Sequence, residues 1–170
     1  SFTRSEGGLA TGLDSLQTAY EKHWIGWPGI CVDNDSDKQA IGEKLEELNF
    51  HPVFLSDTQI KNYYEGYSNS TIWPLCHYFF AYTLYKDTFW QAYREVNKRF
   101  CETICRLIGP EDKVWVQDYQ LMLLPGMLRE AVPDLCIGYF HHIPFPSYEL
   151  FRILPERAEI LKGLLGADFI

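Results

Sequence analysis

The stretch KVWVQDYQLMLLPGMLREAVPDLCIGYFHHIPFPS, residues 113–147, decides the fold class of this 170-residue chain. It contains two runs that are typical of strands, 113–117 with an apolar centre at 114–116 and the continuously apolar 135–140. The segment between them, 121–132, is predicted to be helical around a break at Pro125. Strands without polar alternation belong to parallel sheets that are covered on both faces. The pattern therefore predicts an α/β domain with a mostly parallel sheet and helices on both faces.

Each of the two predicted strands is followed by a side chain that can take part in chemistry. Asp118 comes directly after the first strand, and His142, preceded by a second histidine, follows the second. Ligands of parallel sheets bind beyond the carboxyl ends of the strands, so both side chains are expected at one crevice. There a carboxylate and an imidazole can hold a hydroxyl-bearing substrate, and Pro144 and Pro146 restrict the backbone beyond the imidazole. Two plainer interpretations stay open: Asp118 as a helix cap, and His142 as a histidine satisfied by a backbone carbonyl.

The segment NYYEGYSNSTIWPLCHY, residues 62–78, is dense in aromatic and short hydrogen-bonding side chains. Tyr64 and Trp73 flank the polar run Ser-Asn-Ser-Thr at 68–71. Aromatic faces beside hydroxyls and amides suit a sugar, which offers apolar C–H patches and a rim of hydroxyls. An aromatic core segment is the equally weighted alternative.

A glycine pair, Gly7 and Gly8, precedes a predicted helix at residues 9–23. Such a pair frees backbone N–H groups to meet a phosphate at the helix N-terminus, where the helix dipole favours an anion. On sequence alone, a plain loop is the favoured interpretation of a single glycine pair.

Further helices and strands are predicted on both sides of these segments. The longest helix covers 87–109, because its apolar residues advance by three and four along the sequence. An amphipathic helix at 35–48 is predicted to turn Ile41, Leu45 and Leu48 inward, and Ser56 with Gln59 forms a capping box for the next helix. The remaining predictions are strands within 24–32 and 51–55, helical segments within 148–166 and the start of a strand at 167–170.

Composition narrows the class of protein. Hydrophobic residues make up 46% and aromatic residues 16% of the chain, which excludes a disordered protein. No apolar run approaches the roughly 20 residues of a membrane span. A net charge of −8 argues against nucleic acids and anionic membranes as partners. The five cysteines form no CxxC pair and have no histidine at ligand spacing, so free thiols in a reducing cytoplasm are expected, with no metal site.

The chain resembles the trehalose-6-phosphate synthases, a family of retaining glycosyltransferases with the two-domain GT-B fold. The resemblance covers nearly the whole chain, in the family order: GGLATGL, WIGWPG, YYEGYSNSTIWPLCHY, VWVQDYQLMLLPGMLRE and GYFHHIPFPSYELFRILPERAEILKGLLGADFI. It implies a Rossmann-like sheet and the transfer of glucose from UDP-glucose to glucose 6-phosphate, with trehalose 6-phosphate and UDP as products. It also implies that the transfer needs no metal or other cofactor.

The resemblance assigns roles to individual residues by matching position. Gly7 and Gly8 would lie against the donor nucleotide-sugar, and His142 would contact the donor glucose near the reacting centre. The glucose 6-phosphate pocket would be lined by Tyr64 and Trp73, and Asp118 would hold the acceptor sugar. Family members often read HDYHL where this chain has QDYQL at 117–121, so the aspartate is kept and the flanking residues differ.

The resemblance also leads us to expect that residues 1–170 are a single, incomplete N-terminal domain on the acceptor side of such an enzyme. The second nucleotide-binding domain would lie beyond Ile170, and the isolated chain is expected to be inactive, with homo-oligomers an open point. Two alternatives are a glucosylglycerol-phosphate synthase, which differs in its acceptor pocket, and a catalytically silent regulatory subunit that binds sugar phosphate.

Overall fold

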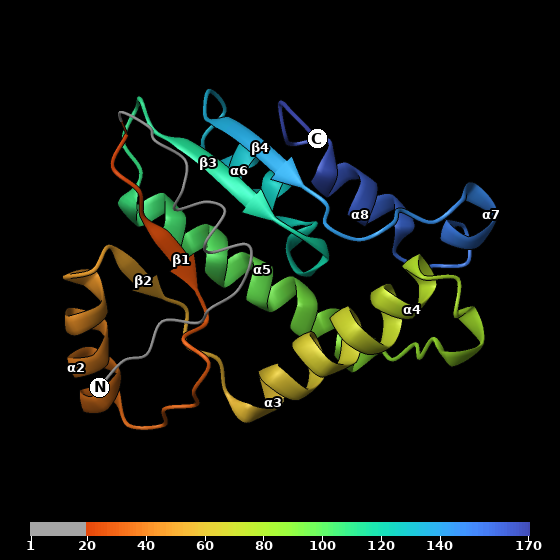
Figure 1. Cartoon of the computed structure of the whole chain (residues 1–170), viewed down its shortest axis with the longest axis horizontal. Coiled ribbons are helices and arrows are strands. Elements are labelled where there is room, and N and C mark those ends of the chain that lie inside the picture. The colour runs from red at the N-terminus through yellow and green to blue at the C-terminus, as the bar shows by residue number, and fades with distance from the viewer. Residues whose placement is uncertain (1–19) are drawn as a thin grey trace.

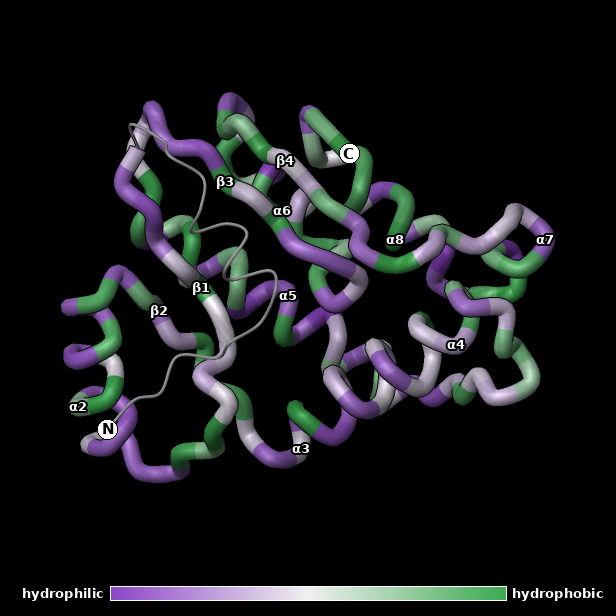
Figure 2. Tube along the Cα trace, in the orientation of Figure 1, coloured by the Kyte–Doolittle hydropathy of each residue, from purple (hydrophilic) through white to green (hydrophobic). Residues whose placement is uncertain are grey.

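A long helix, α5 (Asp87–Leu107), lies at the centre of the molecule, and the computed structural model describes residues 20–170 around it (Figure 1). Figure 2 shows hydrophobic and hydrophilic residues alternating along this helix. The five apolar residues whose spacing predicts it are all buried: Phe89, Tyr93, Val96, Phe100 and Ile104. The helix therefore forms as its apolar periodicity predicts, because one face packs into the core.

Four strands form two parallel pairs. β1 (Trp24–Gly26) pairs with β2 (Phe50–Pro52), and β3 (Lys113–Gln117) pairs with β4 (Cys136–Phe140). Phe169 adds a parallel bridge to Gly138 of β4, where the sequence predicts the start of a strand. The predicted parallel α/β class is confirmed, although within residues 20–170 the strands form two separate pairs rather than one continuous sheet.

One continuous helical segment follows β2 and packs against α5. It consists of α3 (Asp57–Gln59), the π-helical η1 (Ile60–Ile72) and α4 (Trp73–Cys76). The predicted capping box is present at its start, where Ser56 and Gln59 each accept a hydrogen bond from the other's backbone N–H. Close packing on α5 requires a glycine, because a Cβ at Gly66 would lie 2.7 Å from the ring of Phe89.

Helices α6 (Leu124–Ala131) and α8 (Arg157–Leu164) pack against each other beside the β3–β4 pair. Their contact is backbone to backbone, since a Cβ at Gly126 of α6 would lie 2.9 Å from the Cα of Gly163 of α8. The shorter elements are the 3-10 turns η2 (Phe80–Tyr82) and η3 (Tyr119–Leu121) and the helix α7 (Tyr148–Phe151). Among residues 20–170, no helix combines the length and the hydropathy that a membrane crossing needs.

Two sequence predictions at the N-terminal side need correction. Helix α2 (Asp35–Glu46) buries Leu45 as predicted, but Leu48 is 66% exposed. Leu48 lies beyond the helix end, in a turn that Asn49 closes with a positive φ of 56°, so helical spacing no longer applies to it. Residues 20–23 are not helical, and the rest of the helix predicted at 9–23, residues 9–19, lies outside the described residues together with Gly7 and Gly8.

Candidate functional site

The carboxyl ends of β3 and β4 are joined by Asp118. The two strands run in register to the pair Gln117 and Phe140, and the Asp118 N–H then donates to the Phe140 carbonyl at 2.7 Å. The Oδ1 atom of Asp118 accepts from the Tyr119 N–H at 2.8 Å and from the His142 N–H at 3.1 Å. The structure thus brings together Asp118 and His142, as the strand-end argument predicts. The capping interpretation of Asp118 is also correct, and both hydrogen bonds use Oδ1, which leaves Oδ2 with acceptor capacity for a ligand.

The backbone of Asp118 has φ 72° and ψ 175°, a conformation that is essentially reserved for glycine. Holding a non-glycine residue in this conformation costs about 1–3 kcal/mol of folding free energy, and such strained residues concentrate at functional positions. The hydrogen bonds of Asp118 to Phe140, Tyr119 and His142 hold it in this conformation. A carboxylate at this position is therefore maintained against the local backbone preference.

The two adjacent histidines after β4 have different surroundings. His141 bonds through Nδ1 to the Tyr139 hydroxyl at 2.9 Å and meets the ring of Phe145 edge-on at 5.6 Å. Burial lowers the pKa of His141, an effect that Asp118 and the Pro144 carbonyl oppose. His142 is exposed, and its ring lies 6.2 Å from that of Phe140. Of the pair, His142 is thus the imidazole that a ligand can reach.

The aromatic segment at 62–78 contains both buried and exposed rings. Tyr63 and Tyr67 are core residues that pack on Tyr93, with ring centroids 5.8 and 4.6 Å away. Tyr64 and Trp73 are 39% and 38% exposed and form what we call the aromatic helix wall. The alternative of a purely aromatic core is therefore wrong for these two residues.

Tyr64 and Trp73 share a helix face because η1 is a π-helix. Its hydrogen bonds span five residues, as in the bond from the Trp73 N–H to the Ser68 carbonyl. With this wider turn, the nine steps along the chain from Tyr64 to Trp73 make about two full turns. In an α-helix, with about 3.6 residues per turn, the two rings would point in opposite directions. Tyr64 lies beside Trp27, with centroids 6.1 Å apart, and Trp73 stacks on His77 at 4.0 Å.

A hydrogen bond connects η1, the helical segment that contains Tyr64, to the turn after β3. The hydroxyl of Tyr119 donates to Oδ1 of Asn69 on η1 at 3.0 Å. The pKa of Tyr119 is raised to about 12, first by burial and then by Asp118, Tyr64 and Cys76. We refer to Tyr64, Trp73, Asp118 and His142 as the strand-end cluster. Within it, Asp118 bonds to the His142 N–H, whereas the ring of Trp73 contacts His77 and Phe79.

Two buried side chains of α5 hold the backbone of η3, which carries the Asp118 turn. The Tyr93 hydroxyl donates to the Tyr119 carbonyl at 2.7 Å and accepts from the Met122 N–H at 3.0 Å. The Asn97 amide donates to the Gln120 carbonyl at 3.1 Å, and both side chains are fully buried. This support is not among the sequence predictions above, although Asn97, a polar residue on the apolar face of α5, is a signal for it.

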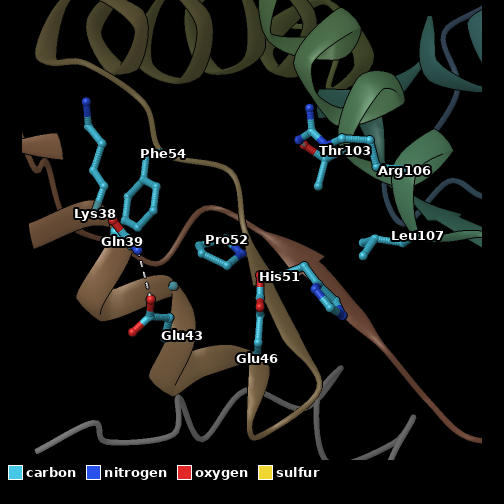
Figure 3. Close-up of a pocket in the computed structure, with 11 residues that line it drawn as sticks. Lys38, Gln39, Glu43, Glu46, His51, Pro52, Phe54, Thr103, Arg106 and Leu107 are labelled. Carbon is cyan, nitrogen blue, oxygen red and sulfur yellow. Dashed lines mark hydrogen bonds between the residues drawn. The ribbon is translucent and has the colours of Figure 1, made fainter. Parts of the chain in front are cut away.

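The described residues also form a pocket of about 460 Å³ away from the strand-end cluster. Figure 3 shows side chains of α2 on one side of it and those of α5 on the other, with His51 and Pro52 of β2 between them. Its lining mixes charges, with Lys38 and Arg106 against Glu43 and Glu46. At the strand ends, by contrast, hydrogen bonds hold Asp118 next to the His142 backbone, and the backbone of the turn is itself held by Tyr93 and Asn97. We therefore place the functional site at the strand-end cluster.

The whole chain, residues 1–170, matches the model of glycosyltransferase family 20. It is 49% identical over 169 residues to the trehalose-6-phosphate synthase of Mycobacterium avium, a match that covers 99% of the chain and 34% of that relative. A solved alpha,alpha-trehalose-phosphate synthase (UDP-forming) from Burkholderia xenovorans superposes with a TM-score of 0.80 at 26% identity, covering 96% of this chain and 36% of that one. A solved structure from E. coli gives a TM-score of 0.82 at 27% identity, covering 99% and 37%. The chain thus spans about a third of the length of the proteins that it matches.

Proposed function

The chain belongs to glycosyltransferase family 20, and from this we propose that its protein transfers glucose from UDP-glucose to glucose 6-phosphate, yielding trehalose 6-phosphate and UDP. In this reaction the bond from the glucosyl carbon to UDP breaks and a bond to an acceptor hydroxyl oxygen forms, with release of the hydroxyl proton. The observation that carries the proposal is the junction of Asp118 and His142 at neighbouring strand ends. Asn69 and Tyr119 connect that junction to an exposed aromatic surface.

We assign the acceptor sugar to Tyr64, Trp73 and Asp118. The exposed rings of the aromatic helix wall offer apolar faces to the C–H patches of a sugar. The Oδ2 atom of Asp118 accepts from sugar hydroxyls while Oδ1 holds the turn. The synthase from Burkholderia xenovorans was solved in complex with glucose-6-phosphate, which supports this acceptor.

We assign the donor glucose to His142, together with Gly7 and Gly8 for the nucleotide-sugar. The His142 N–H donates to Asp118, so the backbone that carries the exposed imidazole is fixed next to the acceptor-binding carboxylate. An imidazole held in this way lowers the barrier most when it hydrogen-bonds to charge that develops in the transition state. The structure from E. coli is bound with UDP-2-fluoro glucose, which supports a UDP-sugar donor.

The proposal places residues 1–170 in one domain, on the acceptor side of a GT-B enzyme, and the protein in the cytoplasm. The five free cysteines fit a reducing compartment. The proposed reaction uses no metal cofactor, so the full-length protein should keep its rate of UDP release after dialysis against EDTA.

The acceptor decides between the proposal and its alternatives. Full-length protein is incubated with UDP-glucose and either glucose 6-phosphate or glycerol 3-phosphate, and UDP release is measured. We expect release with glucose 6-phosphate only. Release with glycerol 3-phosphate only would identify a glucosylglycerol-phosphate synthase. Binding of glucose 6-phosphate without release of UDP would identify a regulatory subunit.

Asp118→Asn tests the acceptor assignment. The amide keeps an oxygen for the Tyr119 and His142 N–H groups but loses the charge that strengthens hydrogen bonds from sugar hydroxyls. We expect calorimetry to show glucose 6-phosphate bound about tenfold more weakly, with UDP-glucose affinity changed less than twofold. Loss of donor binding with intact acceptor binding would contradict the assignment.

A further inference from the structure

We infer that Tyr119 is a positioning residue that, through its hydrogen bond to Asn69, sets the separation between the aromatic helix wall and Asp118. The inference rests on the proposed function for the identity of the acceptor. Tyr119 itself is buried, with 9% of its surface exposed. Its role is therefore to hold other groups in place and not to touch the sugar.

Tyr119 is hydrogen-bonded both to Asp118 after β3 and to Asn69 on η1. Its backbone N–H donates to the carboxylate of Asp118, and its side-chain hydroxyl donates to Asn69 at 3.0 Å. Its carbonyl accepts from the buried Tyr93 hydroxyl, which anchors the residue to α5. Tyr119 thus connects Asp118 to η1, through its backbone N–H at one end and its side-chain hydroxyl at the other.

Asn69 is the member of the polar run 68–71 that reaches across to the strand ends. The Ser70 hydroxyl donates back to the Glu65 carbonyl, and the Thr71 hydroxyl donates to the Leu84 carbonyl. Ser68 is fully buried. Asn69 also lies between Tyr64 and Trp73 in the sequence. A displacement of Asn69 therefore moves the helical segment that carries both rings.

The hydroxyl of Tyr119 is a permanent donor to Asn69. Its pKa is raised to about 12, mainly by burial and by the neighbouring Asp118, so the proton is retained at any physiological pH. The Tyr119–Asn69 bond therefore fixes the spacing between an aromatic face and a carboxylate, and a sugar must match that spacing to contact both.

Tyr119→Phe removes the hydroxyl and keeps the ring. In the full-length protein we expect glucose 6-phosphate to bind about five- to tenfold more weakly by calorimetry, the scale of one net hydrogen bond. UDP-glucose affinity should change less than twofold, and the KM for glucose 6-phosphate should rise with little change in kcat. Asn69→Ala should give a similar loss, and the double variant should lose no more than either single one.

Tyr67→Phe is the matched control. Tyr67 lies on η1, is 2% exposed and donates to Glu156 at 3.1 Å, so the same change removes a comparable hydrogen bond outside the strand-end cluster. It should leave glucose 6-phosphate affinity within twofold. Equal losses in Tyr119→Phe and Tyr67→Phe, or additive losses in the Tyr119 and Asn69 variants, overturn the inference.

Amide hydrogen exchange separates this inference from the proposed function. In ligand-free protein, Tyr119→Phe should speed exchange in 69–73 and 118–121, whichever sugar binds. If wild-type protein binds no glucose 6-phosphate, the proposed function fails and exchange alone decides the inference. Unchanged exchange in both segments overturns it.

Discussion

The region around β3 and β4 and the region around β1, β2 and α2 use the same plan of parallel strands with a connecting helix, but they are fixed differently. The η3 turn after β3 is held by Tyr93 and Asn97, which are fully buried and hydrogen-bonded to backbone. Helix α2 buries only Leu45 of its 12 residues. The strand ends that carry Asp118 and His142 are thus the ones whose neighbouring backbone is held in place by hydrogen bonds from buried polar side chains.

Both regions place two histidines side by side, with different outcomes. At the β1–β2 pair, Nδ1 of His23 lies 2.9 Å from Nε2 of His51, and the rings stack with centroids 5.2 Å apart. Each ring is thus the partner of the other. After β4, His141 bonds to Tyr139 and His142 stays open to a ligand. A histidine pair by itself therefore does not indicate a functional site; the partners of each ring do.

The largest expected difference between the regions is catalytic. His142→Ala should lower turnover about a hundredfold or more, the scale for losing one group that meets transition-state charge. His51→Ala removes an imidazole of the β1–β2 region and should leave turnover within about twofold. UDP release at saturating substrates measures both, and circular dichroism checks the fold. Similar rates in the two variants would remove His142 from the mechanism.

The next difference concerns packing and has opposite signs in the two regions. Gly163→Ala forces a methyl group against the backbone of Leu123, at 2.8 Å, and should destabilise the protein by about 1–3 kcal/mol. Gly42 lies inside α2, and an alanine methyl group there would have open space around it among the described residues. Gly42→Ala should therefore stabilise the protein by about 0.5–1 kcal/mol. Urea unfolding measures both. A stabilising Gly163→Ala would show that α6 and α8 can separate at no cost.

The smallest effect is the pH dependence of stability in the β1–β2 region. The pKa of His51 is lowered below 6.5 by burial and by His23, while Glu46 opposes this. The unfolded state then binds the proton more tightly, so the free energy of unfolding falls as pH drops through 6.5. His51→Gln should flatten this dependence between about pH 7.5 and 5.5 in urea unfolding. Part should remain, because burial also lowers the pKa of His141. An unchanged slope would exclude His51 as a contributor.

The sequence predicts the elements whose apolar pattern is long or continuous. Helix α5 and strands β3 and β4 form where their spacing and apolar runs predict them, and the joined strand ends then bring Asp118 and His142 together. Prediction fails where a turn interrupts the period, as at Leu48, which falls outside α2. It also misses the Tyr119–Asn69 bond, because a contact between residues 50 positions apart depends on tertiary packing and leaves no local pattern.

The π-helical geometry of η1 has a consequence for comparing and engineering such proteins. Because Tyr64 and Trp73 share a face only through the wider turn, the count of residues between them is as much a determinant of the surface as their identity. Removing one residue from this interval would rotate one ring away from the other while leaving every aromatic side chain in the sequence. Alignments that admit a gap here, and grafts that convert this segment to a regular α-helix, would therefore keep the aromatic residues of the motif but lose their common face.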